Sequence, residues 1–323
     1  MREITYTRAI TEGYAVAMRK DPTTFIVGEG IADRGGCFGQ TLRLLREFGP
    51  QRVLDMPISE AGFVGMCAGA AACGSRAVVD IMFFDFAALA MDQIVNQAAK
   101  LRYMSGGQYE MPLTIVGVSG ASGSGGPHHS QSLHPWFIHI PGIIVALPSN
   151  GPDMKGLLAA TILANDLAVV MAHKGLLSTK WDVPEEDYTL PLGEARIARE
   201  GTDVTVVATG MMVEHALAAA EQLTGEGVSV EVIDPRTLVP LDEDAIVESV
   251  KKTKHLVVAD EGYSACGVGA EIIACVQERA FGSLSAPARR IHPLSAPIPF
   301  SPVLERAVIP DVDRIVAGVR GML

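Results

Sequence analysis

Four of the chain's eight histidines fall within twelve residues, in the stretch "GPHHSQSLHPWFIHIPG" at 126–142. They are His128, His129, His134 and His139. A metal site on one helix favours a spacing such as HxxxH. Here the spacing is H-H-x4-H-x4-H, and Pro135 and Pro141 interrupt it. We therefore do not expect these histidines to bind a metal.

The position of this stretch favours a site of another kind. It follows a short apolar segment, "PLTIVGV" (112–118), and a glycine-rich run, "SGASGSGG". Ligands of open α/β sheets bind beyond the carboxyl ends of strands, and a histidine placed there can exchange protons with a ligand. For His128 and His129 we favour a catalytic role, and for His134 and His139 simple packed or surface positions. The glycine run fits neither GxGxxG nor GxxxxGK[ST], so alone it does not indicate a phosphate site.

Two acids stand where other apolar segments end. Glu29 lies in "VGEG" (27–30), and Glu60 lies in "DMPISEAGF" (55–63) before a helix rich in glycine and alanine. In one interpretation, Ser59 caps that helix and Glu60 complements its dipole. In the other, Glu60 is a carboxyl group directed at a ligand. The aromatic residues of "FFDF" (83–86) end a third segment, and several such groups at one sheet edge indicate a pocket.

The elements that must position these groups alternate along the chain. Short apolar strands between helices indicate a mostly parallel sheet flanked by helices, the α/β class. In the first half we predict helices at 7–20, 62–74, 86–104 and 153–165, and strands at 24–30, 77–84, 112–118 and 142–149. In the second half we predict strands at 203–209, 228–234, 255–260 and 288–292, and helices at 212–224, 242–252, 268–280 and 310–322.

A polar stretch with two prolines separates the two halves. It lacks a sustained hydrophobic period, so we place the domain linker in it. The predicted organisation is a first domain at 1–185, a linker at 186–201 and a second domain at 202–323.

Composition limits the function classes. The chain has 323 residues, of which 48% are hydrophobic and 20% charged, and this is typical of globular proteins. A formal net charge of −11 without a basic run argues against nucleic-acid binding. Five scattered cysteines argue against a disulfide scaffold. The absence of an apolar leader and of a membrane-length segment predicts a cytoplasmic protein, or the mature form of an organellar one, that does not bind membranes.

Several long motifs, in order, resemble one family. The stretches "ISEAGF", "MFFDFAALAMDQIVNQAAKLRYMSGGQ", "HHSQSLHPWFIHIPG", "EVIDPRTLVPLDEDAIVESVKKTKHLVV" and "PIPFSPVLERAVIPDVDRIV" are similar to the β subunit of the E1 component of 2-oxoacid dehydrogenase complexes. The resemblance covers residues 4 to 320. It implies a transketolase-like fold, in which the first domain binds the aminopyrimidine ring of thiamine diphosphate and the second serves oligomer contacts.

The resemblance also implies roles for single residues. Glu60 would hydrogen-bond N1′ of the aminopyrimidine, Phe86 would stack on that ring and Ile58 would line it. Glu29 would be an interior acid of a proton-conducting chain. His129, the histidine of "HSQ", would lie beside the reacting carbon, where it would stabilise the intermediate or assist acyl transfer. Relatives usually carry Gln or Tyr where this chain has His128, so His128 bears on substrate choice.

The same resemblance implies partners. An α subunit with a GDG motif, which this chain lacks, would supply the diphosphate and Mg²⁺ site in an α₂β₂ heterotetramer. A lipoyl-bearing E2 acyltransferase would accept the acyl group from a small 2-oxoacid, with pyruvate expected first. The stretch "TILANDLAV" (161–169) lacks residues of a potassium-binding loop of some relatives, so no metal site is expected on this chain. The alternatives are an acetoin dehydrogenase E1 β subunit, the pyrimidine-binding half of a split transketolase, and a non-catalytic docking subunit.

Overall fold

A computed structural model describes residues 1–323, which divide into two units. The first unit holds residues 1–119 and 136–192, and the second holds residues 120–135 and 193–323. The border at 192/193 falls inside the predicted linker 186–201, and β9 (Arg196–Arg199) forms within that stretch. The segment 120–135, which carries His128 and His129, groups with the second unit although it lies between two strands of the first.

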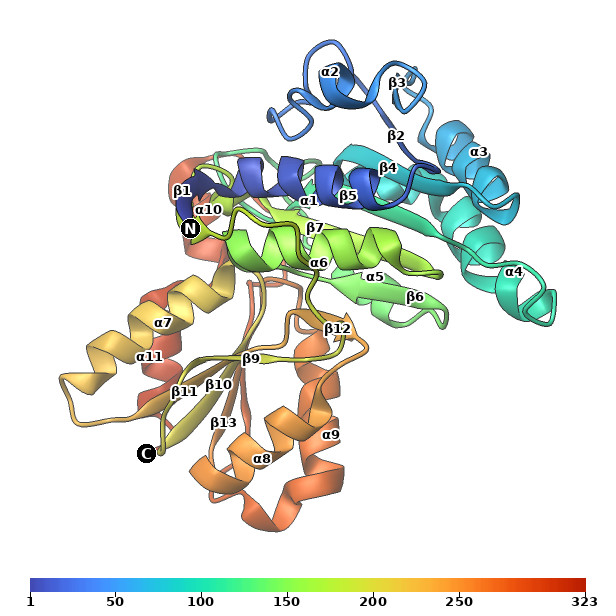
Figure 1. The fold of residues 1–323 in the computed structure, drawn as a ribbon. Coiled ribbons are helices and arrows are strands. Elements are labelled where there is room, and N and C mark those ends of the chain that lie inside the picture. Colours follow the sequence, from blue (N-terminus) through green and yellow to red (C-terminus); the bar gives the residue numbers. More distant parts are fainter. The chain divides into compact units, whose positions relative to one another are not determined.

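The first unit follows the predicted alternation of strands and helices (Figure 1). Its strands are β1 (Arg2–Thr5), β2 (Thr24–Gly28), β3 (Val53–Asp55), β4 (Arg76–Phe83), β5 (Leu113–Ser119), β6 (Ile143–Ala146), β7 (Leu167–His173) and β8 (Lys180–Val183). Its helices are α1 (Tyr6–Lys20), α2 (Leu44–Phe48), α3 (Glu60–Ala72), α4 (Ala99–Met104), α5 (His134–Ile138, which begins at the border) and α6 (Gly151–Leu163), with the shorter turns η1 (Phe84–Ala90), η2 (Asp92–Ala98) and η3 (Lys174–Leu176).

Six of these strands form a parallel sheet in the order β6-β7-β5-β4-β2-β3. Every residue of β5 and β7 is buried, as expected for parallel strands covered on both faces. Helices α1 and α6 pack against each other, and Figure 1 shows them side by side. Strands β1 and β8 make a separate antiparallel pair. The predicted parallel α/β architecture is confirmed.

One prediction for this unit is wrong, and one buried strand was not predicted. The helix predicted at 86–104 is a 3₁₀ segment (η1), a π segment (η2) and a short α-helix (α4). Its apolar residues fit one long helix, but Phe84 and Asp85 are both buried, and a tighter first turn accommodates them. Strand β7 was not predicted, because a strand buried on both faces lacks the alternation that distinguishes it from a buried helix.

The second unit is a five-stranded sheet in the order β14-β13-β10-β11-β9, parallel except for β9 at its edge. Its other strands are β10 (Val204–Ala208), β11 (Val230–Asp234), β13 (Leu256–Ala259) and β14 (Arg289–Ile291), and the unit also holds the short strand β12 (Thr237–Val239) outside this sheet. Its helices are α7 (Met211–Thr224), α8 (Glu243–Thr253), α9 (Val268–Ala280), α10 (Pro302–Val308) and α11 (Val312–Arg320), with the turn η4 (Phe281–Ser283).

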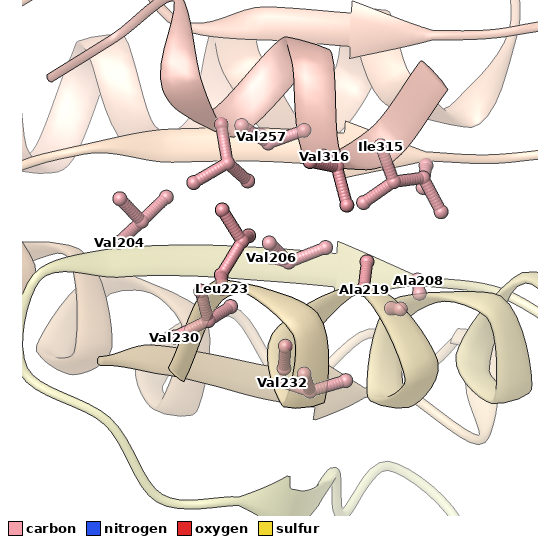
Figure 2. Close-up of a cluster of buried hydrophobic side chains, with 14 of the residues drawn as sticks. Val204, Val206, Ala208, Ala219, Leu223, Val230, Val232, Val257, Ile315 and Val316 are labelled. Carbon is pink, nitrogen blue, oxygen red and sulfur yellow. The ribbon is translucent and has the colours of Figure 1, made fainter. Parts of the chain in front are cut away.

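Helices α7 and α11 cover one face of this sheet with a continuous core. Val206 and Val257 from the strands meet Leu223 of α7 and Ile315 of α11, and each is fully buried (Figure 2). This core fixes the strands whose carboxyl ends carry the polar groups described below. None of the helices combines the length and the hydropathy needed to cross a membrane.

Candidate active site

The acids predicted for the first unit gather at one edge of its sheet. Gly28, the last residue of β2, lies between Asp55 of β3 and Asp80 of β4 in the strand register. Glu29 follows Gly28, so it lies where the carboxyl ends of three parallel strands meet. A cavity of about 590 Å³ opens there, and its lining includes Glu29 and Ile58.

Glu29 has a carboxyl oxygen without a hydrogen-bond partner. Oε1 is buried and accepts no hydrogen bond. Burial raises the pKa of Glu29, and the charges of Glu60 and Asp80 raise it further. A buried acceptor is almost always satisfied in a folded protein, so this oxygen is suited to receive a donor from a ligand or a shared proton.

Glu60 is close enough to Glu29 for its charge to raise the pKa of Glu29, and it is 6% exposed. It is the first residue of α3, and Ser59 before it makes no side-chain capping hydrogen bond. Ser59 therefore occupies the N-cap position without capping the helix through its side chain, while Glu60 does lie in the first turn, where it complements the helix dipole. Burying the Glu60 carboxylate would be costly if the carboxylate only complemented the helix dipole. Its burial therefore favours the interpretation in which Glu60 binds a ligand.

Apolar and aromatic residues follow the carboxyl ends of β3 and β4 at the same edge. Ile58 lines the cavity and is 83% exposed. Phe83 makes edge-to-face contacts with Phe38 at 5.4 Å and with Phe86 at 6.4 Å between ring centroids. Phe86 belongs to the 3₁₀ segment η1. Phe86 and Ile58 therefore both follow strand ends at this edge of the sheet.

Asp80 is a member of this group that the sequence analysis missed. It is 3% exposed in the middle of β4, and it accepts hydrogen bonds from the Tyr14 hydroxyl at 2.8 Å and from Gln40 Nε2 at 3.1 Å. Burial raises the pKa of Asp80 to about 6, although both hydrogen bonds oppose the shift. The signal was present in "AVVDIMFF", where a single acid interrupts a buried strand.

The Asp80→Asn variant should lose a specific pH dependence of stability. The folded-state pKa of about 6 lies above the value of about 3.9 in the unfolded chain. The unfolded chain therefore releases this proton first, and the free energy of unfolding should fall as the pH rises from about 4 to above 6, by about 2–3 kcal/mol. Asparagine cannot ionise, so the variant should gain stability relative to the native chain over that window. Urea unfolding at pH 4.5 and pH 8 measures this, with the exposed Asp187→Asn as control. Parallel stability curves for the Asp80→Asn variant and the native chain would contradict the assignment.

The histidines separate into two groups. His134 is 2% exposed and its Nε2 lies 3.0 Å from a carboxyl oxygen of Asp260, whereas His139 is exposed. These are the packed and surface positions predicted for them. His128 is exposed and His129 half-buried, on the segment that groups with the second unit. The backbone N–H of His129 donates to Gly126 O at 3.3 Å and closes the tip of the loop.

Comparisons with known proteins agree with this architecture. Residues 2–180 match the family of the transketolase pyrimidine-binding domain, and residues 193–315 match that of the transketolase C-terminal domain. The β subunit of acetoin:2,6-dichlorophenolindophenol oxidoreductase from Bacillus subtilis is 44% identical, over 98% of this chain and 96% of the relative. The pyruvate dehydrogenase E1 component β subunit of Rhizobium meliloti is 41% identical, over 100% of this chain and 70% of the relative.

A solved structure supports the fold independently of close sequence similarity. The structure described as a split-gene transketolase, inactive β4 tetramer, superposes with a TM-score of 0.81 over 98% of both chains, at 21% identity. At this identity the likeness concerns the fold alone.

Proposed function

The chain belongs to the transketolase-like family that contains the β subunits of acetoin and pyruvate dehydrogenase E1 components. From this we propose that it is the β subunit of a 2-oxoacid dehydrogenase E1 component. Its reaction is the oxidative decarboxylation of a 2-oxoacid, pyruvate first, with acyl transfer to a lipoyl-bearing E2. An α subunit completes the enzyme as α₂β₂ and carries the Mg²⁺ and diphosphate site.

Membership of this family implies the use of thiamine diphosphate. The observation that carries the proposal is the unsatisfied, buried Oε1 of Glu29 in a cavity that Ile58 also lines. The buried Glu60 is close enough for its charge to raise the pKa of Glu29. These groups suit an aminopyrimidine, which offers an amino donor, ring nitrogens and two flat faces. When bound, the cofactor supplies a carbon nucleophile and an electron sink for decarboxylation.

The residues of this chain then take distinct roles. Glu60 holds a proton at N1′ of the aminopyrimidine. The carboxyl groups of Glu29 and Glu60 interact electrostatically, so the protonation of each depends on that of the other. Phe86 and Ile58 orient the ring and exclude water from its faces. On the histidine loop, His129 exchanges protons at the reacting substrate, and His128 contributes to substrate selection.

Acetoin is a second candidate substrate, and one specific observation favours it. Relatives that act on acetoin by name, from Bacillus subtilis and Cupriavidus necator, are each 44% identical to this chain, against 41% for the pyruvate dehydrogenase relatives from Rhizobium meliloti and rice. The same carbon nucleophile would then cleave a bond between two carbonyl-level carbons.

The test is turnover by the chain co-expressed with an α subunit. Pyruvate, acetoin and branched-chain 2-oxoacids are assayed with an artificial electron acceptor, with and without thiamine diphosphate and Mg²⁺. We expect cofactor-dependent turnover of pyruvate. Turnover of acetoin alone would select the second candidate. Turnover of a ketose phosphate, or of none of these substrates with the cofactor bound, would contradict the proposal.

A further inference from the structure

The loop that carries His128 and His129 is held at both of its ends by one carboxylate. This histidine loop comprises Gly120–Pro135. Oε1 of Glu261 accepts the backbone N–H of Ala121 at 2.6 Å, near the start of the loop, and the hydroxyl of Ser132 at 3.0 Å, near its end. The N–H of Gly120 also donates to Gln131 O at 3.1 Å, so the two ends lie together.

The residue before Glu261 holds the same end of the loop. Asp260 is fully buried, and its carboxylate accepts from His134 Nε2 at 3.0 Å and from the Thr209 hydroxyl at 2.5 Å. Burial alone would raise the pKa of Asp260, but His134, Thr209 and the nearby His292 lower it to about 2. Asp260 is therefore an anion throughout the neutral range. Gly262 leaves the space for this pair, because a Cβ there would lie 2.8 Å from Asp260 Oδ2.

We call Glu261 and Asp260, with the loop groups that they bind, the clamp. The sheet of the second unit fixes its position. Asp260 follows β13, Thr209 follows β10 and His292 follows β14, three neighbouring parallel strands. Their carboxyl ends lie on one edge, so the groups that follow them converge. Strand β13 is completely buried, which makes it a rigid base for the two acids after it.

A third acid holds the loop nearer its tip. Oε2 of Glu305, in α10, accepts the backbone N–H of Ser124 at 3.1 Å, and Glu305 is 6% exposed. Ala121 packs against Ile298 and Val308 beneath it. Charged acceptors make shorter and stronger hydrogen bonds to backbone N–H groups than neutral acceptors do, which suits Glu261 and Glu305 to fixing a glycine-rich segment.

We propose that Glu261 and Asp260 are positioning residues that set the conformation of the histidine loop, and through it the placement of His129, from the second domain of this chain. Only the expected effect of Glu261 on catalysis, through His129, rests on the proposed function. Its structural part, that Glu261 holds the loop, stands on the hydrogen bonds of Ala121 and Ser132 alone. Glycines at 120, 123, 125 and 126 give the loop many alternative conformations, and these contacts restrain it at both ends.

The test compares Glu261→Ala, Glu261→Gln and Glu231→Gln in the α₂β₂ complex. Hydrogen–deuterium exchange of peptides from the loop is measured together with kcat and KM for pyruvate. For Glu261→Ala we expect loop exchange at least about 10-fold faster and kcat about 10- to 100-fold lower, with KM within about twofold, because a small misplacement of a catalytic group acts on the rate. Glu261→Gln keeps an acceptor oxygen and should restore most of both.

Glu231→Gln is the matched control, since Glu231 is equally buried in β11 of the same domain and its bonds go to Ser249, Lys252 and Gly201. It should change neither loop exchange nor kcat. If Glu261→Ala does not fold, Ser132→Ala removes one of the two contacts and should give a smaller change of the same kind.

Unchanged loop exchange in Glu261→Ala overturns the proposal. Faster exchange with native kcat also overturns it, because the clamp would then have no bearing on the reaction. A native complex that binds thiamine diphosphate but turns over none of the substrates would contradict the proposed function instead, and exchange would still decide whether Glu261 holds the loop.

Discussion

Replacing Glu60 with glutamine is expected to lower cofactor-dependent turnover by about 100- to 10,000-fold, the range of a lost acid–base group. Glu60 is buried at the start of α3, and its charge raises the pKa of Glu29. The amide has nearly the same shape but holds no exchangeable acidic proton. The loss should therefore fall on kcat, while the dissociation constant of thiamine diphosphate changes much less.

The measurement is steady-state turnover of pyruvate by the α₂β₂ complex, with cofactor affinity measured separately by calorimetry. Glu271→Gln is the matched control, because Glu271 lies in the first turn of α9, a helix of the same length as α3. Any effect through the helix dipole should appear in both variants and amount to no more than about 1 kcal/mol of stability. Native turnover in Glu60→Gln would favour a purely structural Glu60 or a docking subunit without chemistry.

Local patterns predicted most of the fold. The strands β10, β11 and β13 are short apolar runs bounded by polar residues or glycine, so their existence follows from burial alone. The change of helix type after β4, from 3₁₀ to π, could not be predicted in this way. It depends on how Phe84 and Asp85 become buried together, and this is a tertiary effect.

The residues of the candidate site also differ in whether the local sequence indicates them. Glu29 and Glu60 could be predicted because each follows the end of a parallel strand, a position that the sequence reveals. Asp80 and the clamp on the histidine loop could not, because their roles arise from contacts between distant segments. Asp260 lies 126 residues from His134, and Glu261 lies 140 from Ala121. A single acid in a buried strand, or two acids after one, is the only local sign of such a network.

Replacing His129 with asparagine is expected to reduce overall turnover with lipoyl-E2 by about 100-fold, the lower part of the range for a general acid or base. His129 is half-buried in a loop whose tip is closed by its own backbone N–H and whose ends are held by Glu261. Asparagine is smaller than histidine but keeps a polar nitrogen near the position of Nδ1, and the loop ends remain held by Glu261, so the loop should keep its conformation. The change therefore isolates proton exchange by the imidazole.

Two assays on this variant separate the two roles open to His129. If the imidazole acts on the decarboxylation step, turnover with the artificial electron acceptor falls as far as turnover with lipoyl-E2. If it assists only acyl transfer, the artificial-acceptor rate stays near native while the lipoyl rate falls. His139→Asn is the control, since His139 is exposed and has no place in the proposed site. Native rates in both assays for His129→Asn would remove the histidine from the mechanism. The hydrogen bonds of Glu261 would then position nothing that the reaction needs, so this single variant also bears on the positioning role proposed for Glu261.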